Sequence, residues 1–106
     1  MANVLSLRRR GPAARLPDRL GELRGPMVGT VVLPVHLSWH SLREFDVAAG
    51  PDRLCLYTIV LSQGKRNDIA RFVHPGLLCR DWPQLRGLLT PQVRDACVRK
   101  LGLPSA

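Results

Sequence analysis

The 106-residue sequence has little of what usually assigns a function directly. Its three cysteines, Cys55, Cys79 and Cys97, are odd in number and include no Cys-x-x-Cys pair of the kind that holds zinc or a redox centre. Aromatic residues make up 5% of the chain, and no apolar run approaches the roughly 18 residues of a membrane span. We therefore expect reduced thiols in a cytoplasmic protein with no membrane partner.

Catalytic and cofactor motifs are also missing. The chain has no Gly-x-Ser-x-Gly elbow, phosphate loop or glycine-rich dinucleotide turn. In an extended strand, His36 and His40 would lie on the same face and could hold a metal together. No third ligand lies near them in the sequence. Glu44 and Asp46 share one face of an expected strand, where two solvent-facing acids are commoner than a catalytic pair. We predict a protein that is not an enzyme and has no cofactor or bound metal.

Charge of one sign dominates what is present. The formal net charge is +8, and 14 of the 16 basic residues are arginine. A surface of this kind attracts nucleic acid, acidic proteins or anionic membranes without choosing among them. A GC-rich genome would also favour arginine over lysine, so the charge by itself identifies no partner.

The composition changes near Met27. Residues 1–26 are rich in arginine, proline and glycine, which prevent a long helix. We predict that they form a disordered basic arm, or an extension upstream of a functional start at Met27. Residues 27–106 have the pattern of a small α+β module. In the arm, the cluster Arg8, Arg9 and Arg10 would contact nucleic acid or an acidic partner.

The module is expected to begin with β structure. Residues 30–37 are rich in β-branched side chains, but Pro34 has no amide hydrogen, which favours an edge strand or a bulge. Residues 43–47 alternate polar and apolar side chains and can pair with it as a hairpin through residues 38–42.

Helices are expected over the rest of the module. Gly50, Pro51 and Asp52 are typical of a helix start, and Gly64 of its C-terminal cap. A shorter second helix is expected to be capped by Asn67 and Asp68 and stopped by Pro75 and Gly76. Residues 77–89 fit a strand or a helix before Pro83. Thr90 and Pro91 open a last helix that Gly102 closes. The predicted fold is a small single α+β domain in which an N-terminal edge strand or hairpin precedes three to four short helices.

Several single residues have expected places. Cys55 and Cys97 lie in apolar helical patterns, where cysteine acts as a small core residue. Trp39 and Trp82 are expected in the core, with the rim of a binding surface as the alternative. His74 is expected at a helix C-terminus, where it would interact favourably with the helix dipole.

The turn between the two central helices invites comparison with a DNA-binding helix-turn-helix. The match is poor, because Val60 stands where a close crossing needs a small residue and Lys65 stands where an apolar residue should follow the turn. We expect a helical hairpin that packs. Lys65, Arg66 and Arg71 would project from it and contact phosphates without reading bases.

Five runs of the sequence resemble a group of short bacterial proteins of unassigned biochemistry that occur beside nucleotidyltransferase-type toxins. The runs are LPVHLSW (33–39), REFDV (43–47), LYTIVLSQG (56–64), DIARFV (68–73) and LLCRDWPQL (77–85). The resemblance covers roughly residues 31–96 and implies a partner or antitoxin-like role. The chain departs from the group at residues 74–76, where His-Pro-Gly replaces an acidic Asp-Gly turn.

These observations predict a non-catalytic binding protein, an accessory or antitoxin-like partner of another protein. The alternative is a DNA-binding regulator that uses the helical hairpin 52–73. For either role, the predicted contact residues are Arg8, Arg9, Arg10, Lys65, Arg66 and Arg71.

Overall fold

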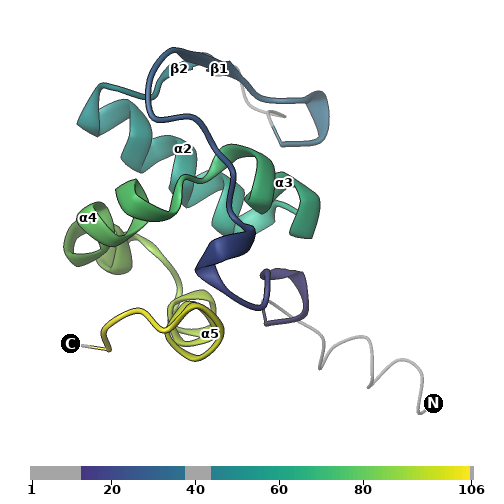
Figure 1. The fold of residues 1–106 in the computed structure, drawn as a ribbon, viewed down its shortest axis with the longest axis vertical. Coiled ribbons are helices and arrows are strands. Elements are labelled where there is room, and N and C mark those ends of the chain that lie inside the picture. The colour runs from purple at the N-terminus through teal and green to yellow at the C-terminus, as the bar shows by residue number, and fades with distance from the viewer. Residues whose placement is uncertain (1–12, 38–43, 106) are drawn as a thin grey trace.

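The computed structural model describes residues 13–37 and 44–105. They form a small α+β domain in which a two-stranded antiparallel sheet lies beside a group of helices (Figure 1). Strand β1 (Thr30–Val32) pairs with β2 (Glu44–Asp46), with Val31 opposite Phe45. In each strand the middle side chain is buried and its neighbours are exposed, so one face of the sheet covers the core.

The first strand is shorter than the sequence predicted. After Val32 the chain leaves the extended conformation, and Val35–Leu37 form a 3-10 helix, η2. The Leu37 N–H donates to the Pro34 carbonyl at 2.9 Å, which closes this turn. The predicted edge strand is thus confirmed for its first half only. The predicted connection through residues 38–42 lies outside the described residues.

Helix α2 (Gly50–Gln63) is the central element and packs against α3, α4, β2 and η2. Helix α3 (Arg66–Phe72) follows after two residues, and α4 (Pro75–Leu85), η3 (Arg86–Leu88) and α5 (Pro91–Leu101) complete the domain. In Figure 1 the sheet lies at one end of the molecule and α5 at the other. The predicted fold class is confirmed.

The predicted end of α2 is confirmed at Gly64, and its physical reason is a close contact. The Gly64 N–H donates to the Val60 carbonyl at 2.8 Å, and the backbone there is extended rather than left-handed. A Cβ on Gly64 would lie 2.5 Å from the Val60 oxygen. Any larger residue would therefore force the helix end apart.

The junctions around α3 differ from the predictions. Asp68, the third residue of α3, alone caps the helix. Its side chain accepts a hydrogen bond of 2.9 Å from the Lys65 N–H. Pro75 begins α4 rather than only stopping α3. His74 is the N-cap of α4, and its Nδ1 accepts the Gly76 and Leu77 N–H groups. The prediction of His74 at a helix C-terminus is therefore wrong, because its ring reaches forward to unpaired amides of the next helix.

Residues 77–85, which fit either a strand or a helix, are helical, and Pro83 lies inside α4. Trp82 is buried, and its indole N–H donates to the Pro104 carbonyl at 2.7 Å. The prediction of a core position is confirmed for Trp82, whereas Trp39 lies outside the described residues.

Residues 13–26 pack on the domain, which corrects the predicted boundary at Met27. Leu16 and Leu23 are buried in the same core as α2 and α4. The guanidinium of Arg15 donates to the Leu61, Ser62 and Gly64 carbonyls, where the negative end of the α2 dipole favours a cation. A disordered arm ending at residue 26 is therefore wrong for residues 13–26. Residues 1–12 lie outside the described residues.

Candidate functional site

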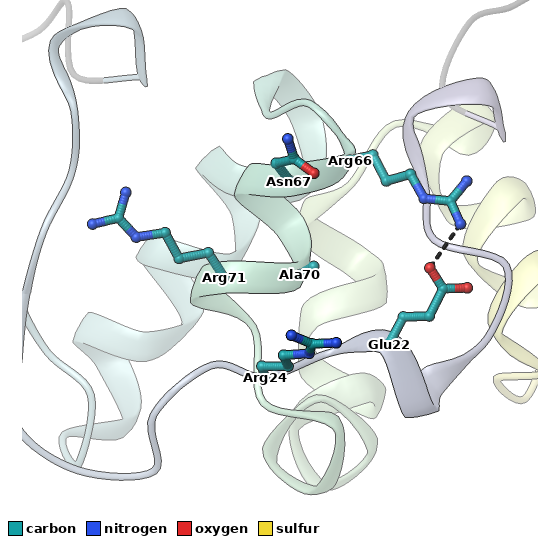
Figure 2. A pocket seen from close by; sticks show the side chains of 6 residues that line it. All are labelled: Glu22, Arg24, Arg66, Asn67, Ala70 and Arg71. Atoms are coloured by element: carbon teal, nitrogen blue, oxygen red, sulfur yellow. Dashed lines mark hydrogen bonds and ion pairs between the residues drawn. The ribbon is translucent and has the colours of Figure 1, made fainter.

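Residues 24 and 25 run along the C-terminal end of α3 and position the candidate site. The Arg24 N–H donates to the Ala70 carbonyl at 2.7 Å, and the Gly25 N–H donates to the Val73 carbonyl at 3.0 Å. These bonds use carbonyls at the C-terminal end of α3 that lack a partner within the helix. They also place the side chain of Arg24 beside the helix (Figure 2).

Arg66, in the first turn of α3, is held by two carboxylates from the preceding segment. Its Nη2 lies 2.7 Å from Glu22 Oε1 and 3.2 Å from Asp18 Oδ2. Lys100 of α5 also reaches Asp18, at 2.9 Å. The hydrogen bond from Arg66 holds the pKa of Glu22 below its ordinary value, and those from Lys100 and Arg66 do the same for Asp18. The positive charge of Arg66 is thus largely neutralised within the chain.

Arg24 and Arg71 carry the positive charge that remains at this place. They line a depression of about 500 Å³ together with Glu22, Arg66, Asn67 and Ala70. In Figure 2 Arg66 points toward Glu22, whereas Arg71 extends away from it on the other side of α3. The Arg71 guanidinium lies over the Phe72 ring, 4.9 Å from its centroid. Within residues 13–37 and 44–105, neither Arg24 nor Arg71 has a carboxylate partner.

The six predicted contact residues therefore differ in their situation. Arg71 is exposed in the depression and keeps its charge available; Arg66 lies there too but is bound internally; and Lys65 is exposed just before α3. Arg8, Arg9 and Arg10 lie outside the described residues. The sequence-based prediction does not include Arg24, because it assigns residues 1–26 to a disordered arm. The spacing of Leu16, Leu20 and Leu23, typical of one helical face, was the signal that this segment packs.

A second depression, of about 330 Å³, adjoins the first at Arg71. It is lined by Pro26, Arg71, Phe72 and the three residues of β1. The chain beside it exposes apolar side chains: all the large, strongly exposed hydrophobic residues of the described chain except Leu88 belong to residues 27–35. They are Met27, Val28, Val32 and Val35. Free positive charge and exposed apolar surface thus meet at β1.

A third depression, of about 520 Å³, follows the outer face of α2 and is lined by uncharged residues. They are Pro51, Leu54, Cys55, Thr58, Ile59 and Leu88. Cys55 is exposed there, which corrects its predicted core position, whereas Cys97 is buried as predicted. Burial raises the pKa of the Cys97 thiol to about 12, so this sulfur is an inert core atom at neutral pH.

The histidine pair considered as a metal site is not assembled by the described part of the chain. His36 Nε2 lies 3.0 Å from Asp68 Oδ2, and His40 lies outside the described residues. No group of three His, Cys, Asp or Glu side chains able to hold a metal ion occurs in residues 13–37 and 44–105. His36 instead links η2 to the start of α3.

Comparisons with protein-family models, with curated proteins and with solved structures found no match for this chain. The helices of the described segments are all too short or too polar to cross a membrane. The site geometry is therefore the basis for a functional conclusion, and the resemblance to toxin-associated bacterial proteins stays a prediction.

Proposed function

We propose that the chain is a non-catalytic binding protein, an accessory or antitoxin-like partner of another protein, and that it binds an acidic segment of that partner at Arg24 and Arg71. The observation that supports this most directly is that the arginines of one depression differ in their carboxylate partners. Arg66 has two internal carboxylates, whereas Arg24 and Arg71 have none among the described residues. A carboxylate from outside would complete the same charge-assisted bonds.

The surroundings favour a protein segment over a nucleic acid. Glu22 lies at one side of the depression, where its carboxylate is already paired with Arg66. Exposed apolar side chains lie at the other side, and they suit the mixed surface of a protein partner. We also propose a cytoplasmic location, where three cysteines without a disulfide are ordinary.

DNA binding through the helical hairpin is the second candidate. Asn67 and Arg71 are exposed on α3 and Lys65 is exposed just before it, and such side chains contact phosphates and base edges. Helix α3 has only seven residues, which gives it a short surface for a DNA groove. This candidate predicts binding to a 20-base-pair duplex with a steep salt dependence and a sequence preference.

The test is affinity capture of the tagged full-length protein from native lysate after nuclease treatment. The key variant is Arg24→Ala/Arg71→Ala, and the matched control is Arg80→Ala/Arg99→Ala, which removes two exposed arginines elsewhere. We expect a single protein partner that the wild type and the control retain and the key variant loses. Equal retention by both variants, or recovery only without nuclease, would overturn the proposal.

The predicted contribution of the N-terminal arginines needs a separate variant. Arg8→Ala/Arg9→Ala/Arg10→Ala should leave the nuclease-resistant partner in place, because the proposed carboxylate contacts are at Arg24 and Arg71. Fluorescence anisotropy with a labelled duplex would show whether the same variant loses affinity for nucleic acid and flattens its salt dependence. Binding that depends on this trio and on nucleic acid would favour the second candidate.

A further inference from the structure

We infer that the free edge of β1 accepts an extended acidic and apolar segment of the partner as a third strand, so that backbone pairing at Thr30 and Val32 accompanies carboxylate contacts at Arg71. This inference rests on the proposed function and specifies its binding mode. Addition of a strand to an open sheet edge is a common way in which a domain recognises an extended peptide.

The register of the sheet defines which backbone groups are free. The Val47 N–H donates to the Gly29 carbonyl at 2.9 Å, and hydrogen-bonded pairs alternate along antiparallel strands. Val31 therefore exchanges its bonds with Phe45, and the N–H and C=O groups of Thr30 and Val32 point away from β2. The same alternation explains why the outward N–H of Asp46, on the opposite edge, bonds to the Asp52 side chain.

The outward backbone groups at the two edges of this sheet therefore differ in their hydrogen-bond partners. The outer edge of β2 has Asp52 as an internal partner. Nothing in the described part of the chain bonds to the outward groups of Thr30 and Val32. Proteins commonly protect an exposed edge by keeping the strand very short or by placing charged side chains or proline in it; β1 is short, with three residues, but Thr-Val-Val has no charge and no proline. As far as residues 13–37 and 44–105 are concerned, the edge of β1 is thus open to a strand from another chain.

The occupant is defined by charge and by surface. Arg71 and Phe72 border the depression that all three residues of β1 line, so a strand laid along β1 passes beside the Arg71 guanidinium. Arg24 lies further along in the adjoining depression. Exposed Val32 and Val28, on the β1 side, offer apolar contacts. An extended segment that alternates acidic and apolar residues matches both features.

Two variants of the chain isolate the backbone contribution. Val32→Pro removes the outward N–H of β1 without removing a bond to β2, since proline is tolerated at such edge positions. Val32→Thr is the matched control, because it keeps the N–H and the β-branched shape. The side chain of Val32 is 51% exposed, so neither change opens a cavity in the core. Circular dichroism and thermal unfolding would establish that both variants fold.

The probe is a fluorescein-labelled nine-residue peptide of alternating glutamate and valine, measured by anisotropy against the full chain. Its control carries N-methyl groups on three consecutive central amides, which keep the charge and block strand pairing on both sides. We expect the control to bind about tenfold more weakly, as the loss of two ordinary hydrogen bonds implies. Val32→Pro removes a single donor and should weaken binding of the unmodified peptide about threefold, whereas Val32→Thr should not weaken it.

The outcomes separate this inference from the proposed function. Equal binding of both peptides, or no binding of the unmodified peptide, overturns strand addition. If equal binding is lost in Arg24→Ala/Arg71→Ala, the basic site stands and only the strand pairing falls. If Val32→Pro does not fold, the comparison of the two peptides on the wild type decides the question. Duplex DNA that displaces the unmodified and the N-methylated peptide equally well would favour the nucleic-acid candidate instead.

Discussion

Arg53 and Asp81 form a buried ion pair that joins the central helix to α4. Arg53 Nη2 lies 2.9 Å from Asp81 Oδ1, and Arg53 Nε bonds to the other carboxylate oxygen. Arg53 Nη1 also donates to the Val47 carbonyl at 3.0 Å, just after β2. Each of the two side chains is less than a tenth exposed. One arginine thus joins three parts of the fold, its own helix α2, helix α4 and the chain just after β2.

Breaking this pair from one side should strongly destabilise the domain. Asp81→Leu would leave the Arg53 guanidinium buried without its counter-ion, a change that typically costs about 3–5 kcal/mol. Since folded domains typically have a free energy of unfolding of about 5–15 kcal/mol, we expect the variant to lose a large share of its stability at 25 °C. Urea unfolding followed by circular dichroism would measure the loss.

Two further variants make that prediction specific. Arg53→Met/Asp81→Leu should recover much of the lost stability, because it removes both charges and keeps the volume. Arg66→Ala, which breaks the exposed contacts with Glu22 and Asp18, should change the free energy of unfolding far less than Asp81→Leu, because solvent screens exposed ion pairs. If Arg66→Ala and Asp81→Leu lower the free energy of unfolding by similar amounts, burial is not what makes the Arg53–Asp81 pair important for stability.

At the scale of elements, the start of α3 depends on one carboxylate. Asp68 accepts the Lys65 N–H at 2.9 Å and lies 3.0 Å from His36 Nε2. Burial raises the pKa of Asp68, but the hydrogen bonds from Lys65 and His36 outweigh it, so the pKa lies below the ordinary value of 3.8. The ionised carboxylate therefore links η2, the turn after α2, and α3.

Stability should consequently fall at acid pH through Asp68. A lowered pKa in the folded state means that the contribution is complete well above pH 3.8 and is lost as the pH falls through the lower folded pKa. We expect Asp68→Asn to reduce the acid dependence of the unfolding temperature between pH 6 and pH 2. At neutral pH the variant should be less stable than the wild type by about 1 kcal/mol.

Asp95→Asn is the control for this pH series, because Asp95 is exposed on α5. It should leave the acid dependence of the unfolding temperature close to that of the wild type. An unchanged pH profile in Asp68→Asn would show that other carboxylates, such as Asp18 and Glu22, dominate acid unfolding.

At the scale of the whole molecule, the segment 13–26 belongs to the folded domain, and Gly25 is where it fits most tightly. A Cβ on Gly25 would lie 2.4 Å from the Phe72 carbonyl carbon and 2.5 Å from its oxygen. Both are backbone atoms at the end of α3, so they cannot move aside as a flexible side chain would. The same close approach positions Arg24 beside α3.

Gly25→Ala should therefore destabilise the protein by about 1–3 kcal/mol, the usual cost of overpacking. Gly21→Ala is the matched control, since a Cβ there meets nothing within 4 Å and should change stability by no more than about 0.5 kcal/mol. Thermal unfolding of the two variants would measure the difference. Equal stability would mean that residues 24 and 25 do not pack on α3.

Because Arg24 is placed by this contact, Gly25→Ala should also weaken the proposed partner binding, whereas Gly21→Ala should not. A chain beginning at Met27 would lack Leu16, Leu23 and Arg15, so we expect it to lose both the core contacts and the charge at the end of α2. Capture experiments with such a truncated chain would then report on folding rather than on the N-terminal arginines.

The sequence alone was sufficient for the elements whose signals are local. β-branched residues predicted the start of β1 and alternating side chains predicted β2. Pro51 and Gly64 predicted the limits of α2, and Thr90, Pro91 and Gly102 predicted those of α5. These residues act through their own backbone conformation or through bonds to neighbours a few positions away. Their effect is therefore readable without knowing what lies across the fold.

Only the tertiary structure decided which charges are available and which segment is part of the core. Arg15 and Arg66 resemble Arg24 and Arg71 in the sequence, yet Arg15 binds the end of α2 and Arg66 binds Glu22 and Asp18. These partners lie more than 40 positions away along the chain, so no local pattern identifies them. The burial of Leu16 and Leu23 likewise depends on a surface that exists only once the helices have packed. Long-range contacts thus make residues 13–26 part of the domain, and among the described residues they leave Arg24 and Arg71 without a carboxylate partner near the edge of β1.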